Sequence, residues 1–117
     1  MFIKTSELTG LALDWAVAQC EEQPVYFHLD DRCLYMGDGL GDWPYAPSKD
    51  WAHGGPLIER EKIDLLSAIK GWQAYINNNE DDPPLIRGIG PTPLIAAMRC
   101  YVASKLGDEV EIPDELT

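Results

Sequence analysis

The sequence predicts a single-domain α+β protein, with N-terminal and C-terminal amphipathic helices packed on a small antiparallel sheet. Three observations predict this class: apolar residues recur with helical spacing near both ends, a short hairpin pattern follows the first helix, and long Gly/Pro-rich loops fill the middle. The 117 residues are enough for one hydrophobic core. Residues 108–117 form an acidic tail of that domain.

The first helix is expected to begin near Thr5 or Ser6, because either hydroxyl can cap the free amides of a first turn. One apolar stripe follows at three- and four-residue steps: Leu8, Leu11, Ala12, Trp15 and Ala18. The stripe leaves Glu7 and Asp14 on the flank or the opposite face. Pro24 then ends the helix, because the residue before a proline avoids helical backbone angles.

Residues 25–29 and 33–36 are predicted to be two strands of a β-hairpin that turns at residues 30–31. Residues 37–42 follow as a loop in which alternating glycines permit positive φ angles. This loop is not a nucleotide-binding fingerprint, because no helix N-terminus of a βαβ unit follows it.

The second half of the chain gives weaker signals of secondary structure between residues 62 and 84. Residues 62–71 fit a short helix or a turn that enters a strand, and the apolar spacing favours the helix slightly. Residues 72–76 alternate large and small side chains, as a strand does. Residues 77–84 are acidic and rich in asparagine, so a mobile loop is expected there.

The last helix has the clearest sequence signals. Thr92 is placed to cap it, Pro93 occupies the first helical position, and Gly107 ends it. Arg99 falls at the border of a wide apolar face. The tail after this helix is expected to be extended and to dock through Val110 and Ile112.

Composition excludes several classes of function. The net charge of −11 disfavours nonspecific binding to duplex DNA and to anionic membranes. The three cysteines show no CxxC spacing, so neither a zinc site nor another metal site is expected. The chain has no apolar segment long enough to span a membrane, and a reducing cytoplasm suits its cysteine content.

The segment from Tyr45 to Arg60 concentrates aromatic, charged and glycine residues, and its two prolines favour a rigid binding loop over a core element. Flat aromatic rings can stack on a base, the glycine amides can approach a phosphate, and an arginine can pair with an anion. The predicted ligand-binding residues are therefore Trp43, Tyr45, Ser48, Asp50, Trp51, His53, Gly54, Gly55, Arg60 and Arg99. The sequence predicts no catalytic residue and no cofactor, because its two histidines lie in no nucleophile or metal-ligand context.

Three stretches carry a family resemblance: residues 4–18, residues 45–60 and residues 90–107. Blocks such as Asp50-Trp-Ala-His-Gly-Gly-Pro-Leu-Ile-Glu59 and Thr92-Pro-Leu-Ile-Ala-Ala-Met-Arg99 resemble the NinX-like family of lambdoid bacteriophages. The resemblance implies a phage accessory protein that acts in the cytoplasm of the infected host. It implies no particular activity, and His53 stands where relatives are expected to carry glutamine.

Three functions remain open. The leading hypothesis is a non-enzymatic homo-oligomer, a dimer or tetramer, that sequesters a small nucleotide-like immune signal. A short match supports it: Pro47-Ser48-Lys-Asp50-Trp51 is similar to the Pro-Ser…Asp-Trp pattern of one Thoeris-counteracting sponge family. The alternatives are an acidic protein-interaction module that inhibits a host or phage nucleic-acid enzyme, and a small hydrolase that uses Asp50, Glu59 or Glu61.

Overall fold

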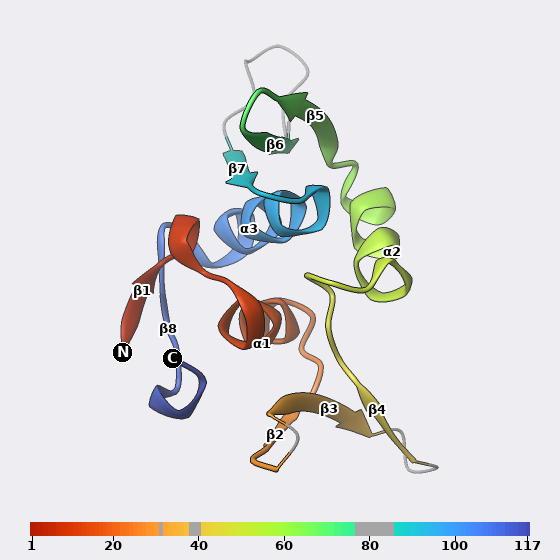
Figure 1. Cartoon of the computed structure of the whole chain (residues 1–117), viewed down its shortest axis with the longest axis vertical. Helices are drawn as coiled ribbons and strands as arrows, with labels where there is room; N and C mark the ends of the chain where they lie inside the picture. Colours follow the sequence, from red (N-terminus) through yellow and green to blue (C-terminus); the bar gives the residue numbers. More distant parts are fainter. Residues whose placement is uncertain (31, 38–40, 77–85) are drawn as a thin grey trace.

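The computed structural model describes residues 1–30, 32–37, 41–76 and 86–117. Within these ranges the chain forms three α-helices and three small antiparallel sheets, which confirms the predicted α+β class. The sheet orders are β1-β8, β2-β3-β4 and β5-β6-β7, and the sheets lie around α1 and α3 (Figure 1). The elements are β1 (Phe2–Lys4), η1 (Thr5–Glu7), α1 (Gly10–Cys20), β2 (Tyr26–His28), β3 (Cys33–Gly37), β4 (Asp42–Pro44), α2 (Trp51–Glu61), β5 (Asp64–Ala68), β6 (Gly71–Ile76), β7 (Ile86–Gly90), α3 (Pro93–Leu106), β8 (Glu109–Glu111) and η2 (Asp114–Leu116).

Helix α3 is the centre of the fold and follows its sequence signals. Thr92 Oγ1 accepts a hydrogen bond from the Ile95 amide at 3.1 Å, Pro93 opens the helix, and Gly107 follows its last residue. The sheet β5-β6-β7 lies close against this helix through Gly88, where an added Cβ would lie only 2.2 Å from the Ala96 carbonyl oxygen. This contact explains why β7 carries glycine where it crosses α3.

Helix α1 begins later than predicted. It starts at Gly10 rather than near Thr5 or Ser6, and residues 5–7 form a 3-10 turn. The cause is long-range bonding: the Thr5 amide donates to the Asp108 carbonyl at 2.7 Å, and Thr5 Oγ1 donates to the Gly107 carbonyl at 2.5 Å. The expected position of Asp14 is also wrong, because α1 is buried on most sides and Asp14 is 2% exposed.

The prediction of a rigid binding loop over the Tyr45–Arg60 segment is wrong for most of its length. Residues Trp51–Glu61 form the helix α2, with Pro56 inside it. Asp50 caps the helix by accepting a hydrogen bond from the Ala52 amide at 2.9 Å. The side chain of Asp50 therefore supplies a start signal that outweighs the missing donor of one proline.

Residues 64–68 form the strand β5, so the slight preference for a helix there is wrong. Strand β5 pairs with β6 across a tight turn in which Ala68 faces Gly71, whose φ of +140° favours glycine. The predicted hairpin at residues 25–36 and the predicted strand at residues 72–76 are confirmed. The expected loop at residues 77–84 lies outside the described residues, as do residues 38–40 of the glycine-rich loop.

The two termini lie side by side because β1 pairs with β8 (Figure 1). Val110 and Ile112 dock on the core, as predicted for the tail, and Ile3 faces Val110 in the strand pair. The pairing partner Phe2–Lys4 was not expected to be a strand. None of the described helices has the length and apolar character needed to cross a bilayer.

Candidate functional site: a basic groove at Arg99

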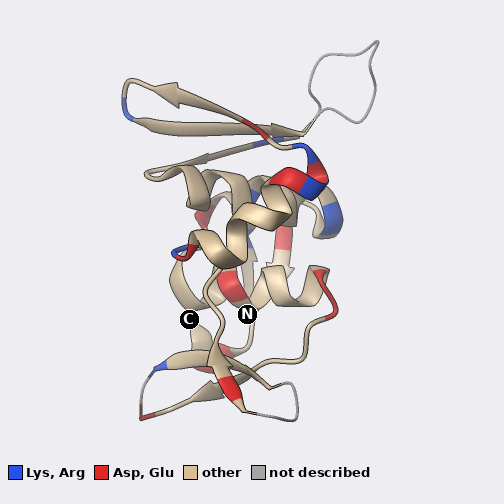
Figure 2. Ribbon diagram, turned by 90° about the vertical axis from the view of Figure 1, so that its right-hand side faces the viewer, with Lys and Arg blue, Asp and Glu red and all other residues tan. Residues whose placement is uncertain are grey.

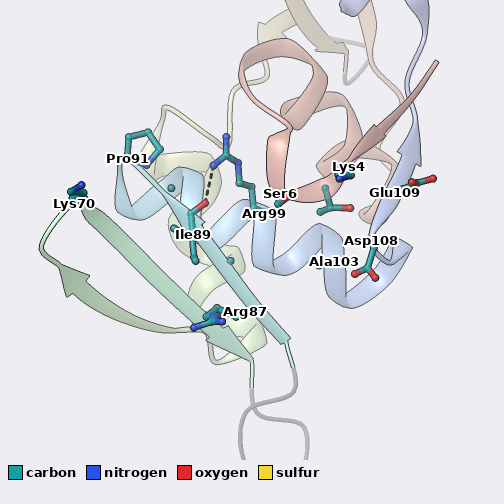
Figure 3. Close-up of a pocket in the computed structure, with 13 residues that line it drawn as sticks. Lys4, Ser6, Lys70, Arg87, Ile89, Pro91, Arg99, Ala103, Asp108 and Glu109 are labelled. Carbon is teal, nitrogen blue, oxygen red and sulfur yellow. Dashed lines mark hydrogen bonds between the residues drawn. The ribbon is translucent and has the colours of Figure 1, made fainter.

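A cavity lies between β7 and the segment Lys4–Ser6, with α3 beneath it (Figure 3). Its volume is about 600 Å³, a size that accommodates a small organic ligand. We call this cavity the Arg99 groove. Its lining residues are Lys4, Thr5, Ser6, Lys70, Arg87, Gly88, Ile89, Gly90, Pro91, Arg99, Ala103, Asp108 and Glu109.

The groove collects positive charge in an acidic protein. Four of the nine Lys and Arg residues line it: Lys4, Lys70, Arg87 and Arg99. In the described part of the chain, the ion pairs involve other residues, although Lys4 faces Glu109 across the β1–β8 pair. Figure 2 shows most of the basic segments in the half of the molecule that carries β5, β6 and β7. A local concentration of unpaired cations attracts an anion even when the net charge is −11.

Arg99 bridges the two walls of the groove. Its Nε donates to the Leu8 carbonyl at 2.7 Å, and its Nη1 donates to the Ile89 carbonyl at 2.8 Å. Burial lowers the pKa of Arg99, but an arginine guanidinium keeps its charge in proteins. The two carbonyl bonds use two of five N–H donors, so a charged, oriented guanidinium presents further donors to the groove.

Strand β7 adds a backbone donor. It is an edge strand of its sheet, and the Ile89 carbonyl points to Arg99 rather than to β6. In an extended strand, the N–H and the C=O of one residue point to the same side. The Ile89 amide therefore also faces the groove, next to the guanidinium of Arg99.

The structure does not bring the predicted site residues together. Arg99 lies in the groove, while Trp43 is on β4 at the opposite end of the molecule and Trp51 begins α2 (Figure 1). Trp51 borders a separate cavity of about 300 Å³ that is also lined by Ser48 and Pro93. Tyr45, His53 and Arg60 border another cavity, of about 330 Å³, so the ten residues are spread over separate places and form no common site.

Several predicted ligand contacts are instead packing contacts. Tyr45 is buried and stacks on His53 with the ring centroids 5.7 Å apart. His53 Nδ1 accepts a hydrogen bond from the Ala46 amide at 3.1 Å, so Nε2 carries the proton of the neutral ring. At Gly54 an added Cβ would lie 2.4 Å from the Pro47 carbonyl oxygen, so this glycine serves close packing. Gly55 stands in the same helix with space around its Cα.

Arg60 is already paired within the protein. Its Nη1 and Nη2 donate to both carboxylate oxygens of Glu21, at 2.8 and 2.6 Å, and Nη2 also donates to the Tyr101 hydroxyl at 3.1 Å. The bond to Arg60 is the main cause that lowers the pKa of Glu21, and the same pair raises the pKa of Arg60. Arg60 therefore holds α2 to the end of α1 and does not offer a free cation.

Ser48 is buried against Asp14. The Ser48 amide donates to Asp14 Oδ1 at 2.8 Å, which fixes the turn before α2 on α1. Among the described residues, no partner completes a hydrogen bond of good geometry with Ser48 Oγ. Burial raises the pKa of Asp14 from 3.8 to about 6, against the lowering influence of Ser48, Lys49 and His53.

The groove was not predictable as a unit because its residues come from four separate segments. Lys4, Lys70 and Arg87 belong to no motif, and only the border position of Arg99 on its helix gave a signal. The described residues contain no group of three His, Cys, Asp or Glu side chains placed to hold a metal ion. Burial raises the pKa of both Cys20 and Cys100 to about 11, so neither thiol is poised as a nucleophile.

Fold and cavity together define a small acidic α+β protein with a groove that four cations line. A family model described as Bacteriophage P22, NinX matches residues 4–105, which is 102 of the 117 residues. The chain belongs to this phage family, and the predicted family resemblance is confirmed. A search of curated proteins gave no match.

Proposed function

We propose that this phage protein binds a small phosphate-bearing, nucleotide-like ligand in the Arg99 groove and holds it without cleaving it. In the cytoplasm of the infected host, a protein with this property sequesters a nucleotide-like immune signal. The observation that carries the proposal is that four cations line one cavity of an acidic chain and form no ion pair with a carboxylate of the described residues. Phosphate oxygens are the natural partners of such cations and of exposed backbone amides.

The groove favours binding over turnover. Its thirteen lining residues include no histidine and no cysteine. Thr5 Oγ1 donates its proton to the Gly107 carbonyl, so this hydroxyl is engaged in the fold. The lining does contain the carboxylates of Asp108 and Glu109, and we propose that they contact the ligand rather than activate a water for hydrolysis.

Calorimetric titration of the purified protein tests the proposal. The panel contains inorganic phosphate, nucleoside monophosphates, cyclic dinucleotides and cyclic ADP-ribose isomers. Lys70→Gln and Arg87→Gln should each weaken binding of the tightest ligand by about tenfold, or roughly 1.4 kcal/mol. Lys49→Gln removes the same charge from an exposed lysine outside the groove and should leave the affinity unchanged.

Three results decide between binding and its alternatives. Ligand recovered intact by chromatography supports sequestration, whereas a cleaved ligand contradicts it. Absence of binding to the whole panel contradicts the proposal, and so does an equal loss in all three variants. Arg99→Ala is a poor first test, because Arg99 also joins Leu8 to Ile89 and its removal loosens both walls.

One observation favours a second function, a protein-interaction module. The sheet β2-β3-β4 carries half-exposed aromatics at the end of the molecule opposite β5-β6-β7, namely Trp43 at 52% and Tyr26 at 43% (Figure 1). Aromatic side chains of this kind anchor many protein interfaces. Capture of a stoichiometric host protein by the wild-type chain, lost in Trp43→Ala, supports this function.

The predicted homo-oligomer also stays a proposal. The apolar faces of α1 and α3 are largely buried within one chain, so the proposal of self-association does not rest on these two helices. Light scattering of the purified protein tests self-association directly. A 13.1 kDa monomer at micromolar concentration contradicts it.

A further inference from the structure

The Arg99 groove is chemically different on its two sides. Figure 3 shows Lys70, Arg87 and Ile89 on one side of Arg99, and Lys4, Asp108 and Glu109 on the other. The first side carries two cations, whereas on the second side two carboxylates oppose the charge of Lys4, so a simple inorganic anion gains more from the first side. An ionised carboxylate only accepts hydrogen bonds, so the second side calls for a ligand group that donates them.

The carboxylate of Asp108 stands on a fixed backbone. Gly107 ends α3 with a φ of +86°, a left-handed angle that favours glycine, and turns the chain towards Thr5. The Asp108 carbonyl then accepts a hydrogen bond from the Thr5 amide at 2.7 Å, and the Gly107 carbonyl accepts one from Thr5 Oγ1 at 2.5 Å. The backbone is thus bonded and the side chain of Asp108 is exposed to the groove.

The two acids do not contribute equally. In the view of Figure 3, the side chain of Asp108 lies beside Ala103 of α3, and the side chain of Glu109 extends outward from β8. We therefore take Asp108 as the acceptor on the second side.

From this asymmetry we infer that the ligand of the groove is a guanine nucleotide, with its phosphate on Arg99 and its base on Asp108. The inference rests on the proposed function and specifies its ligand. In a nucleotide the phosphate and the base lie at opposite ends, with the ribose between them, so phosphate and base reach opposite sides of the groove. Among the nucleobases, guanine presents two adjacent N–H donors, from N1 and N2, that match the two oxygens of one carboxylate.

The experiment compares four purine monophosphates by calorimetric titration of the full chain: GMP, IMP, XMP and AMP. IMP lacks the 2-amino group, so GMP should bind at least about tenfold more tightly than IMP. AMP presents an acceptor at N1 and should bind no better than IMP. XMP carries an oxygen at C2 that faces the carboxylate, and it should be the weakest of the four.

Asp108→Asn sharpens this test. An amide donates to the C2 oxygen of xanthine, so the variant should lose GMP affinity and gain XMP affinity, each by about tenfold. Glu111→Gln removes the same charge from an exposed acid of β8 outside the groove and should leave the order of the four ligands unchanged. Thermal melting of both variants checks that they fold, because the bonds of Asp108 to Thr5 are made by the backbone.

The results separate this inference from the proposed function. Equal affinities for GMP, IMP and AMP, with all three weakened by Lys70→Gln, overturn the guanine assignment and support the groove as a phosphate site. Unchanged preference in Asp108→Asn overturns the assignment as well. If no nucleotide and no phosphate binds to the wild-type chain, both the inference and the proposed function are wrong.

Discussion

The Tyr45–Arg60 segment and the Arg99 groove use the same kinds of residue for opposite purposes. In the segment, Tyr45 stacks on His53, Ser48 bonds to Asp14, and Arg60 bonds to Glu21, so the functional groups meet partners inside the protein. In the groove, cations from separate parts of the chain form no ion pair with a carboxylate of the described residues. A dense run of reactive side chains in sequence therefore marks a packing junction here. The candidate site lies where the cations are left without such ion pairs.

The largest effect that tests this comparison is expected at the two adjacent glycines of α2. Gly54→Ala places a Cβ 2.4 Å from the Pro47 carbonyl oxygen and 2.7 Å from Leu94 Cδ2, and should destabilise the fold by about 3 kcal/mol. Gly55→Ala meets only an ordinary contact of 3.8 Å with Trp51, and should stabilise the helix by about 1 kcal/mol. Urea unfolding of both variants measures the difference. Equal effects would show that the segment does not pack as described.

Asp14→Asn tests the buried anchor of the segment. The pKa of Asp14 is raised on folding, so the carboxyl contributes most stability when protonated, below its unfolded pKa of 3.8. Stability therefore falls as pH rises from 3.8 to about 6, by at most about 3 kcal/mol. The variant should remove this pH dependence and gain about 1–2 kcal/mol at pH 7, because its amide keeps the acceptor for Ser48 and can donate to Ser48 Oγ. Denaturant unfolding of the wild-type chain and of Asp14→Asn at pH 4 and pH 7 measures this difference in stability.

Arg60→Ala tests whether the segment holds helices rather than ligands. The side chain is half exposed, so loss of its bonds to Glu21 and Tyr101 should cost only about 1 kcal/mol. The pKa of Glu21 is lowered on folding, so its contribution is present above the unfolded pKa of 4.5 and is lost as pH falls. Nucleotide affinity at the groove should not change in this variant. A tenfold loss of affinity would show that Arg60 contacts the ligand after all.

The smallest effect is expected for Trp51→Ala. The indole is 53% exposed, so its removal should cost less than about 1 kcal/mol, well below the loss typical of a core tryptophan. Binding in the groove should be unchanged, since Trp51 lies on a separate cavity. Thermal melting and the calorimetric panel check both statements. A large change in affinity would instead place the ligand at Trp51.

The parts of the fold that followed local chemistry were predictable. Thr92, Pro93 and Gly107 mark the limits of α3 through short-range capping, and the hairpin at residues 25–36 shows strand and turn residues in order. The failures came from contacts distant in sequence. Thr5 is drawn from a helix start to the Gly107–Asp108 turn, and residues 64–68 become a strand because β6 is available to pair. The groove could not be predicted from the sequence for the same reason, since only tertiary structure brings Lys4 and Arg87 to Arg99.

The pairing of β1 with β8 also imposes an order on folding. Residues 2–4 find their partners only at residues 109–111, so this pair closes a long loop and costs more chain entropy than a local contact does. Until the pair forms, Thr5 cannot bond to the turn at Gly107 and Asp108, and Lys4–Ser6 cannot form a wall. We therefore expect this wall of the groove to form late in folding, after the local contacts of α1 and α3.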